Sequence, residues 1–175
     1  METLKTMRIR HSCRDYTDTQ ITEEQLQTIL TAAVYAPIGR AFYENMHLTV
    51  IQDPAFLDKW TGEFRQAAGD PNANPLYGGK TFVVVSSKAD TGEIAYANAA
   101  CMVENMSLMA TDLGLGHVYI YGMLRVLENH PEFAKSLGLP EGFRPISGIV
   151  LGYEKNPRTQ EREVPLDRVA IDYIR

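Results

Sequence analysis

The chain has 175 residues, 45% of them hydrophobic, which is enough for one domain, residues 1–175, that buries an apolar core. Its net charge of −5 argues against binding nucleic acid, because a phosphate backbone selects a basic stripe. No apolar run reaches the roughly 20 residues of a membrane span, and the N-terminus lacks a signal-peptide pattern, so we expect a cytoplasmic protein. Cys13 and Cys101 are too few for a disulfide framework and are not spaced like metal ligands, so we expect reduced thiols and no metal site.

Two helices are predicted in the N-terminal part of the chain. The first covers residues 2–9. The second begins at Thr22, which has the spacing of a capping box with Gln25, and it ends before Pro37, which cannot continue a helix. The apolar residues of this second helix recur at helical spacing and are Leu26, Ile29, Leu30 and Ala33.

A strand, a helix, a loop and a second strand follow. Residues 47–51 alternate like a strand, and Asp53 with Pro54 has the pattern of a helix start. A loop rich in Pro, Asn and Gly covers residues 69–80. Residues 81–87 are rich in β-branched side chains, which predicts a strand buried on both faces.

The longest helix is predicted at residues 93–113, and Gly114 is well placed to end it. Its methionines suit either the core or the lining of a site for a flat ring system, and we favour the core. Strands are expected at residues 117–121 and 146–151, with a helix at 127–137 around Pro131. Several helices around one small sheet predict an α+β sandwich.

The last part of the chain changes character after Gly152. Residues 153–163 are polar, whereas residues 164–174 alternate and are partly apolar. Such a tail requires a surface to pack on. Either the rest of its own subunit or a second subunit meets that requirement.

Residues 10–14 concentrate hydrogen-bond donors in a chain that is acidic as a whole. The donors are Arg10, His11, Ser12 and Arg14. Guanidinium groups bind phosphate through two parallel hydrogen bonds, so this run predicts an anion site. The alternative is a solvated basic patch that Asp15 and Asp18 neutralise.

Four segments together resemble the nitroreductase family of FMN-dependent oxidoreductases, over nearly the whole chain. They are residues 10–14 (RHSCR), 32–39 (AAVYAPIG), 105–122, which include LGLGHVYIYG, and 137–153, which include LGLPEG and IVLGY. The resemblance implies a nitroreductase-like fold, in which helices flank a central mixed or antiparallel sheet. It also implies an intertwined homodimer, in which residues 153–175 extend over the partner subunit.

The resemblance implies a role for each donor of residues 10–14. Arg10 and Ser12 would bind the FMN phosphate, and His11 would bind phosphate or ribityl oxygens. Arg14 would lie beside N1 and O2 of the flavin, where its charge stabilises the negative charge that appears on reduction. Arg14 is therefore the expected catalytic residue, and no side-chain nucleophile is expected. The family pattern is variable and often apolar at the position of Cys13, which implies a small packing residue there and not a reactive thiolate.

Two further segments are implied to contact the flavin through their backbone. Pro37, Ile38 and Gly39 would do so from the partner subunit, with Gly39 allowing close approach. Tyr119, Ile120, Tyr121 and Gly122 match the family's x-[IV]-x-G segment, in which the N–H groups of Tyr121 and Gly122 would address N5 and O4.

The chain departs from the family pattern at three places. Residues 38–46 replace the Asn and the Gln-Pro-Trp that usually follow Ala-Pro. Glu163 stands where a basic residue is usual, so Arg158 or Arg162 would contact the phosphate instead. Tyr121 replaces an acidic residue of larger members and would narrow the face that binds substrate.

The leading functional hypothesis is an oxidoreductase that transfers hydride from NAD(P)H through FMN N5 to a nitro compound, a quinone or a related small acceptor. One site would serve both half-reactions, which implies ping-pong kinetics. A second hypothesis is a flavoprotein of the same fold with specialised chemistry, such as dehydrogenation, dehalogenation or flavin fragmentation. A third is a non-catalytic protein that binds FMN or another anionic ligand.

Overall fold

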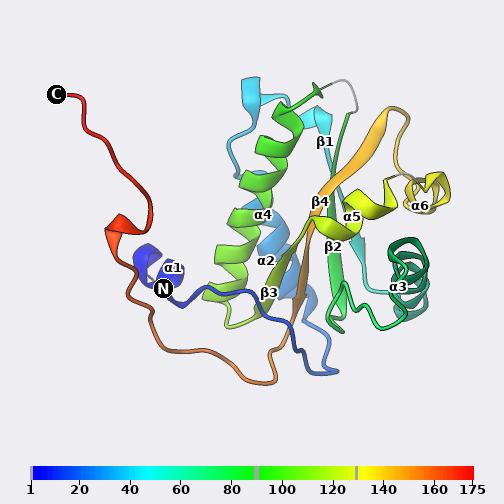
Figure 1. The fold of residues 1–175 in the computed structure, drawn as a ribbon, viewed down its shortest axis with the longest axis horizontal. Coiled ribbons are helices and arrows are strands. Elements are labelled where there is room, and N and C mark those ends of the chain that lie inside the picture. Colours follow the sequence, from blue (N-terminus) through cyan, green and yellow to red (C-terminus); the bar gives the residue numbers. More distant parts are fainter. Residues whose placement is uncertain (1, 89–90, 129) are drawn as a thin grey trace.

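The computed structural model describes residues 2–88, 91–128 and 130–175 (Figure 1). Its elements are, in chain order, α1 (Thr3–Ile9), α2 (Glu23–Val34), η1 (Gly39–Ala41), η2 (Tyr43–Asn45), β1 (Met46–Ile51), α3 (Pro54–Ala68), β2 (Thr81–Lys88), α4 (Ile94–Asp112), β3 (Gly116–Ile120), α5 (Gly122–Leu127), α6 (Pro131–Ser136), β4 (Phe143–Gly152) and η4 (Leu166–Arg168). Within these ranges, no helix is long and apolar enough to cross a membrane.

The strands form one four-stranded sheet in the order β1-β2-β4-β3, and every neighbouring pair is antiparallel. Helices α2 and α4 pack on one face, and α3, α5 and α6 cover the other (Figure 1). This arrangement confirms the predicted α+β fold with an antiparallel sheet. Strand β3 occupies an edge of the sheet, which matters for the site described below.

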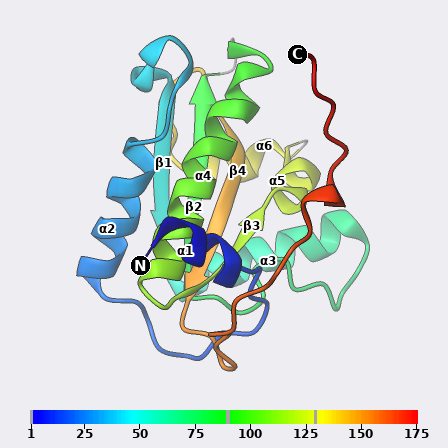
Figure 2. The same cartoon turned by 90° about the vertical axis from the view of Figure 1, so that its left-hand side faces the viewer.

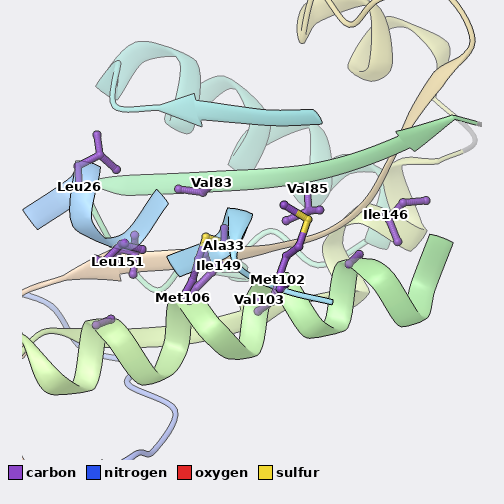
Figure 3. Packing of buried hydrophobic residues seen from close by; sticks show 14 of the residues in the cluster. Leu26, Ala33, Val83, Val85, Met102, Val103, Met106, Ile146, Ile149 and Leu151 are labelled. Carbon is purple, nitrogen blue, oxygen red and sulfur yellow. The ribbon is translucent and has the colours of Figure 1, made fainter. Parts of the chain in front are cut away.

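The first core layer lies between the sheet and α4 (Figure 3). Val83 and Val85 of β2 face Met102 and Met106 of α4, and all four side chains are buried. The methionines of α4 therefore fill the core, as favoured from the sequence. Residues of β2 are buried on both faces of the sheet, which confirms the prediction for residues 81–87.

The second core layer, on the opposite face, is built around Trp60. Its ring contacts Phe82 of β2 and Phe133 of α6, with centroid distances of 6.2 and 4.3 Å. The indole N–H donates a hydrogen bond to Ser136 Oγ at 3.0 Å, so the one polar atom of this buried ring is paired. This layer fixes α3 and α6 against the sheet.

The predicted start of α2 and end of α4 are confirmed. The Thr22 N–H donates to Gln25 Oε1 at 2.9 Å, and the Gln25 N–H donates to Thr22 Oγ1 at 3.2 Å. Gly114 follows α4 with φ +72°, a conformation that glycine adopts without a Cβ penalty. Its N–H donates to the carbonyl of Thr111 at 3.0 Å.

The predicted helix at residues 127–137 is wrong as one element. Leu127 ends α5, and a separate helix, α6, begins at Pro131. His130 is extended, with φ −107° and ψ 93°, because the proline ring disfavours helical backbone in the residue before it. Pro131 thus starts a helix here and does not lie within one.

The predicted strand at residues 117–121 ends one residue early. Tyr121, with φ −125° and ψ −51°, leaves the sheet and precedes α5. Its carbonyl accepts the hydrogen bond of the Arg125 N–H at 3.1 Å, which begins the helical turn. The junction of β3 and α5 therefore follows Ile120 directly.

The C-terminal segment leaves the sheet after β4 and runs past α1 before it projects from the body (Figure 2). The Arg162 N–H donates to the carbonyl of Arg8 at 3.1 Å, so the segment is tied to the end of α1. Beyond this contact its apolar side chains are exposed, and they are Val164, Leu166, Val169, Ile171, Tyr173 and Ile174.

Candidate functional site

The donor run at residues 10–14 lies along the free edge of β3. The Cys13 N–H donates to the carbonyl of His117 at 2.8 Å. Gly116 permits this approach, because a Cβ there would lie 3.0 Å from both Cβ and Sγ of Cys13. The run is thereby held beside the strand that leads to Tyr121 and Gly122.

Cys13 itself is a packing residue, as expected. Its side chain is buried against the second core layer. Burial raises the pKa of the thiol above its ordinary value, and the thiol donates to the carbonyl of Asp15 at 3.3 Å. A protonated, buried thiol is a poor nucleophile.

The two arginines of the run have different surroundings. The half-buried Arg10 has its Nε 3.9 Å from Glu104 Oε1, a long contact with a carboxylate that is 57% exposed. Arg14 is exposed, and its guanidinium lies 5.7 Å from the centre of the Tyr77 ring. Ser12, between them, is half-buried. Both cations are weakly engaged and suited to an anionic ligand.

His11 is turned toward a small cavity of about 180 Å³ beside the run. Its Nε2 lies 3.1 Å from Glu154 Oε2, and its Nδ1 lies 3.3 Å from the carbonyl of Ile9. The Glu154 side chain is only 9% exposed, so this pair is shielded from solvent. His11 is thus held by a carboxylate, which sequence analysis did not foresee.

The buried His117 lines the same cavity. Its Nε2 lies 3.1 Å from the hydroxyl of Thr111, which itself donates to the carbonyl of Ser107 at 2.9 Å. That hydroxyl has given its proton, so His117 Nε2 must carry the hydrogen and Nδ1 carries none. Nδ1 is buried and has no hydrogen-bond partner among the described residues.

Burial lowers the pKa of His117 to about 3, and the nearby positive charges of Arg10 and His11 add to this effect. The imidazole is therefore neutral at physiological pH. The sequence places His117 in a predicted strand and does not mark it as a site residue. A histidine within a hydrophobic strand gives no signal of its own, because the contact with Thr111 forms only after folding.

The junction of β3 and α5 presents both side chains and backbone. Tyr119, Tyr121 and Gly122 are exposed, whereas Ile120 is buried. The first N–H groups of a helix have no partner within the helix, so α5 begins with backbone donors next to the exposed Tyr121. The start of α5 therefore offers backbone donors beside an exposed aromatic side chain.

The loop at residues 37–39 lies on another part of α4. Pro37 is exposed and Ile38 buried, and the Gly39 N–H donates to Asn98 Oδ1 at 3.0 Å. A Cβ at Gly39 would overlap Cδ1 of Ile94, so glycine allows this close approach. Arg10 instead contacts α4 at Glu104, six residues and about 9 Å further along the axis. The loop and the donor run therefore meet α4 at different points along its length.

Arg162 and Arg158 take different positions. The Arg162 guanidinium donates to the carbonyls of Arg8 and Arg10, at 3.2 Å for Arg8, and so fixes the end of α1. Arg158 is exposed and lies at the cavity that His11 and His117 line. Of the two, Arg158 keeps its guanidinium free of these backbone contacts.

The antiparallel sheet between two helical layers, with a cationic run on its edge, defines a nitroreductase fold. The structure matches that of a nitroreductase with bound FMN from Bacteroides fragilis with a TM-score of 0.86, at 28% identity and over 99% of this chain and 100% of that chain. The model of the nitroreductase family matches residues 7–153. The chain belongs to this family.

Two relatives agree with this assignment. One, from Archaeoglobus fulgidus, bears a name that describes an NADH dehydrogenase or NAD(P)H nitroreductase; it is 30% identical over 90% of this chain and 88% of its own length. The other is an NADPH-flavin oxidoreductase from Vibrio harveyi, 29% identical over 91% of this chain and 69% of its own length.

Proposed function

We propose that this chain is an FMN-dependent oxidoreductase that passes electrons from NAD(P)H to a small acceptor such as a nitro compound or a quinone. The observation that carries the proposal is the cationic run on the edge of β3, beside the exposed start of α5. Family membership and the FMN bound to the similar nitroreductase from Bacteroides fragilis support the same cofactor.

The donor set fits a mononucleotide. Arg10 and Ser12 are half-buried, and the ion pair of Arg10 with Glu104 is long, at 3.9 Å, so the guanidinium can bind a phosphate. His11, held by Glu154, supplies a further polar group at the same run. We assign the FMN phosphate to Arg10, His11 and Ser12, and we place Arg158 on the outer side of that phosphate site.

When bound, FMN accepts hydride at N5 and returns two electrons to an acceptor. Arg14 would place a fixed positive charge beside N1 and O2, where negative charge develops. The N–H groups of Tyr121 and Gly122 would donate to N5 and O4. Arg162 would act indirectly, by holding the backbone of Arg10 in place.

We further propose that the site is completed in a homodimer. Residues 1–175 would form one FMN-binding domain, and of the tail, residues 153–175, the part beyond the contact of Arg162 with Arg8 would extend over the partner. Gly39 contacts α4 at Asn98, away from the point where Arg10 meets that helix, and we propose that Pro37, Ile38 and Gly39 reach the flavin of the partner subunit. Exposed apolar side chains on α1 and at the end of α2 support this, among them Tyr35, which directly follows α2 and is 80% exposed.

One observation favours specialised chemistry as the second candidate function. Arg40 and Ala41 are consecutive non-glycine residues with φ of 59° and 57°. Strained backbone of this kind is concentrated at functional sites. It lies in the loop that replaces the usual Asn and Gln-Pro-Trp, next to the proposed flavin contacts.

Anaerobic titration tests the proposal. NADH or NADPH should bleach the absorbance of the FMN-loaded protein, and menadione should restore it. A flavin that only dithionite bleaches would contradict the proposed electron donor. It would favour specialised chemistry or a binding role.

A further inference from the structure

We propose that Arg125 and Arg144 form a binding site for an anionic group, such as a carboxylate or phosphate, on a reactant that reaches the flavin. The inference rests on the proposed function and specifies in addition that a reactant carries a negative charge. It assigns a role to two arginines that belong neither to the donor run nor to the two core layers.

Three elements bring the pair together at one phenol oxygen. Nη1 of Arg125, on α5, lies 3.2 Å from Tyr96 Oη, and Nη1 of Arg144, on β4, lies 3.1 Å from the same atom. Tyr96 is on α4, and the Arg144 guanidinium lies 5.3 Å from the centre of its ring. Two cations thus share one neutral acceptor.

One carboxylate is present for these two cations. Glu128 pairs with Nη1 of Arg125 and lies 3.4 Å from Nη1 of Arg144. The three groups therefore carry a net charge of +1. Among the described residues, Nε and Nη2 of both guanidiniums have no partner, which leaves donors for a second anion.

The pair is accessible and lies at the proposed reaction site. The side chains of Arg125 and Arg144 are 43% and 26% exposed. Arg125 is one turn after Tyr121 on α5, and the ring of Tyr121 meets that of Tyr96 edge-on with centroids 6.4 Å apart. Tyr121 is the residue whose N–H is assigned to flavin N5.

This position selects a reactant by charge. A ring that stacks beside Tyr121 would place an attached oxyanion within reach of guanidinium groups, whereas a neutral ring gains nothing from them. The oxyanion would belong either to the acceptor or to NAD(P)H, whose phosphates have the same chemistry. Measuring reduction by NAD(P)H and reoxidation by the acceptor separately distinguishes these two sources.

Stopped-flow kinetics of the FMN-loaded full-length protein test the inference. Reduction is measured with NADH and with NADPH, and reoxidation with 1,4-naphthoquinone and with its 2-sulfonate. The variants are Arg125→Gln, Arg144→Gln and the charge-retaining Arg125→Lys. Lys59→Gln is the matched control, because Lys59 also pairs with a carboxylate, at 3.8 Å, but lies on α3.

Each Gln variant should lower the second-order rate constant for the anionic reactant about 5-fold, the effect of one partly exposed ion pair. The neutral quinone should be unaffected, and Arg125→Lys and Lys59→Gln should behave like the parent. A loss confined to the sulfonated quinone assigns the anion to the acceptor. A loss confined to reduction assigns it to NAD(P)H.

Equal effects on charged and neutral reactants, or no effect of Arg125→Gln on any of them, would overturn the inference. Arg125 is partly exposed, so its variants test the proposal even if Arg144→Gln fails to fold. A parent protein that binds FMN but reacts with no donor would contradict the proposed function instead, and the two failures are thus distinguishable.

Discussion

Arg10 and Arg14 lie four residues apart, but the structure separates their surroundings. Arg10 is half-buried near Glu104, and Arg14 is exposed beside the ring of Tyr77. The sequence predicts the cluster from residue types alone, since donors at this density are rare in an acidic chain. The roles of Glu154, Thr111 and Arg162 are not predictable in this way, because the side chain of each acts through a contact that forms only in the folded chain.

Arg14→Ala should lower the midpoint potential of bound FMN and slow its reduction more than it weakens binding of oxidised FMN. Removing one charged contact to a developing anion costs about 2 to 4 kcal/mol, or about 10²- to 10³-fold in rate. Arg10→Ala should chiefly weaken binding. Potentiometry and flavin titration of both variants decide this. An unchanged potential in FMN-saturated Arg14→Ala would assign both arginines to the phosphate.

His117 should make the protein less stable in mild acid. Its folded pKa of about 3 lies below the ordinary value of 6.5, so the folded state binds fewer protons between these values. The stabilisation is complete above pH about 6.5 and declines as the pH falls toward 3. Between pH 7.5 and 5.5 the free energy of unfolding should fall by about 1.4 kcal/mol from this group.

Urea unfolding at both pH values measures this change. The variant His117→Gln lacks the titrating group and should lose most of this pH dependence, whereas His130→Gln, at an exposed histidine, should keep it. If His117→Gln and the parent lose the same free energy on acidification, His117 is not the source of the effect.

At the scale of elements, the sequence predicted those helix ends that are determined by residues at the helix end itself. The capping box of α2 and the glycine after α4 are examples. The break between α5 and α6 was missed because apolar residues on both sides of Pro131 keep helical spacing. Pro131 is itself the local signal that separates the two helices, because it disfavours helical backbone at His130.

Gly148 of β4 should tolerate no side chain. A Cβ there would lie 2.6 Å from Phe82 Cε2 and 2.7 Å from the carbonyl oxygen of Val83, and the backbone atom cannot move aside. Gly148→Ala should destabilise the fold by about 1 to 3 kcal/mol, the usual cost of overpacking. Thermal and urea unfolding measure the loss.

The matched control is Gly62→Ala, within α3, where a Cβ meets no atom within 4 Å. Alanine has the higher helix propensity, so this change should stabilise the protein by about 0.5 to 1 kcal/mol. Equal stabilities for the two variants would contradict the packing described at the centre of the sheet.

At the scale of the whole molecule, exposed apolar side chains are concentrated on the tail, with others on α1, at the end of α2, in residues 42–43, and at Ile94, Tyr119 and Tyr121. The tail projects from the body in Figures 1 and 2, with several apolar side chains in solvent. A change of composition at Gly152 predicted a tail that needs a surface. The sequence did not identify that surface, because it is equally consistent with a tail that packs on its own subunit and with one that packs on a second subunit.

Deletion of residues 164–175 should release FMN and yield monomer or aggregate, because the tail would no longer cover the partner subunit. Analytical ultracentrifugation with detection of flavin absorbance measures both properties at once. A truncated dimer that binds FMN as tightly as the full chain would show that the tail is not shared between subunits.

Two copies of this chain should bind FMN at sites that both subunits build, and the whole proposed function depends on this assembly. Native mass spectrometry of the protein, after incubation with excess FMN, measures the number of chains and the mass of each bound ligand together. We expect a dimer that carries two FMN molecules. A complex with FAD, or protein without flavin, would contradict the proposal.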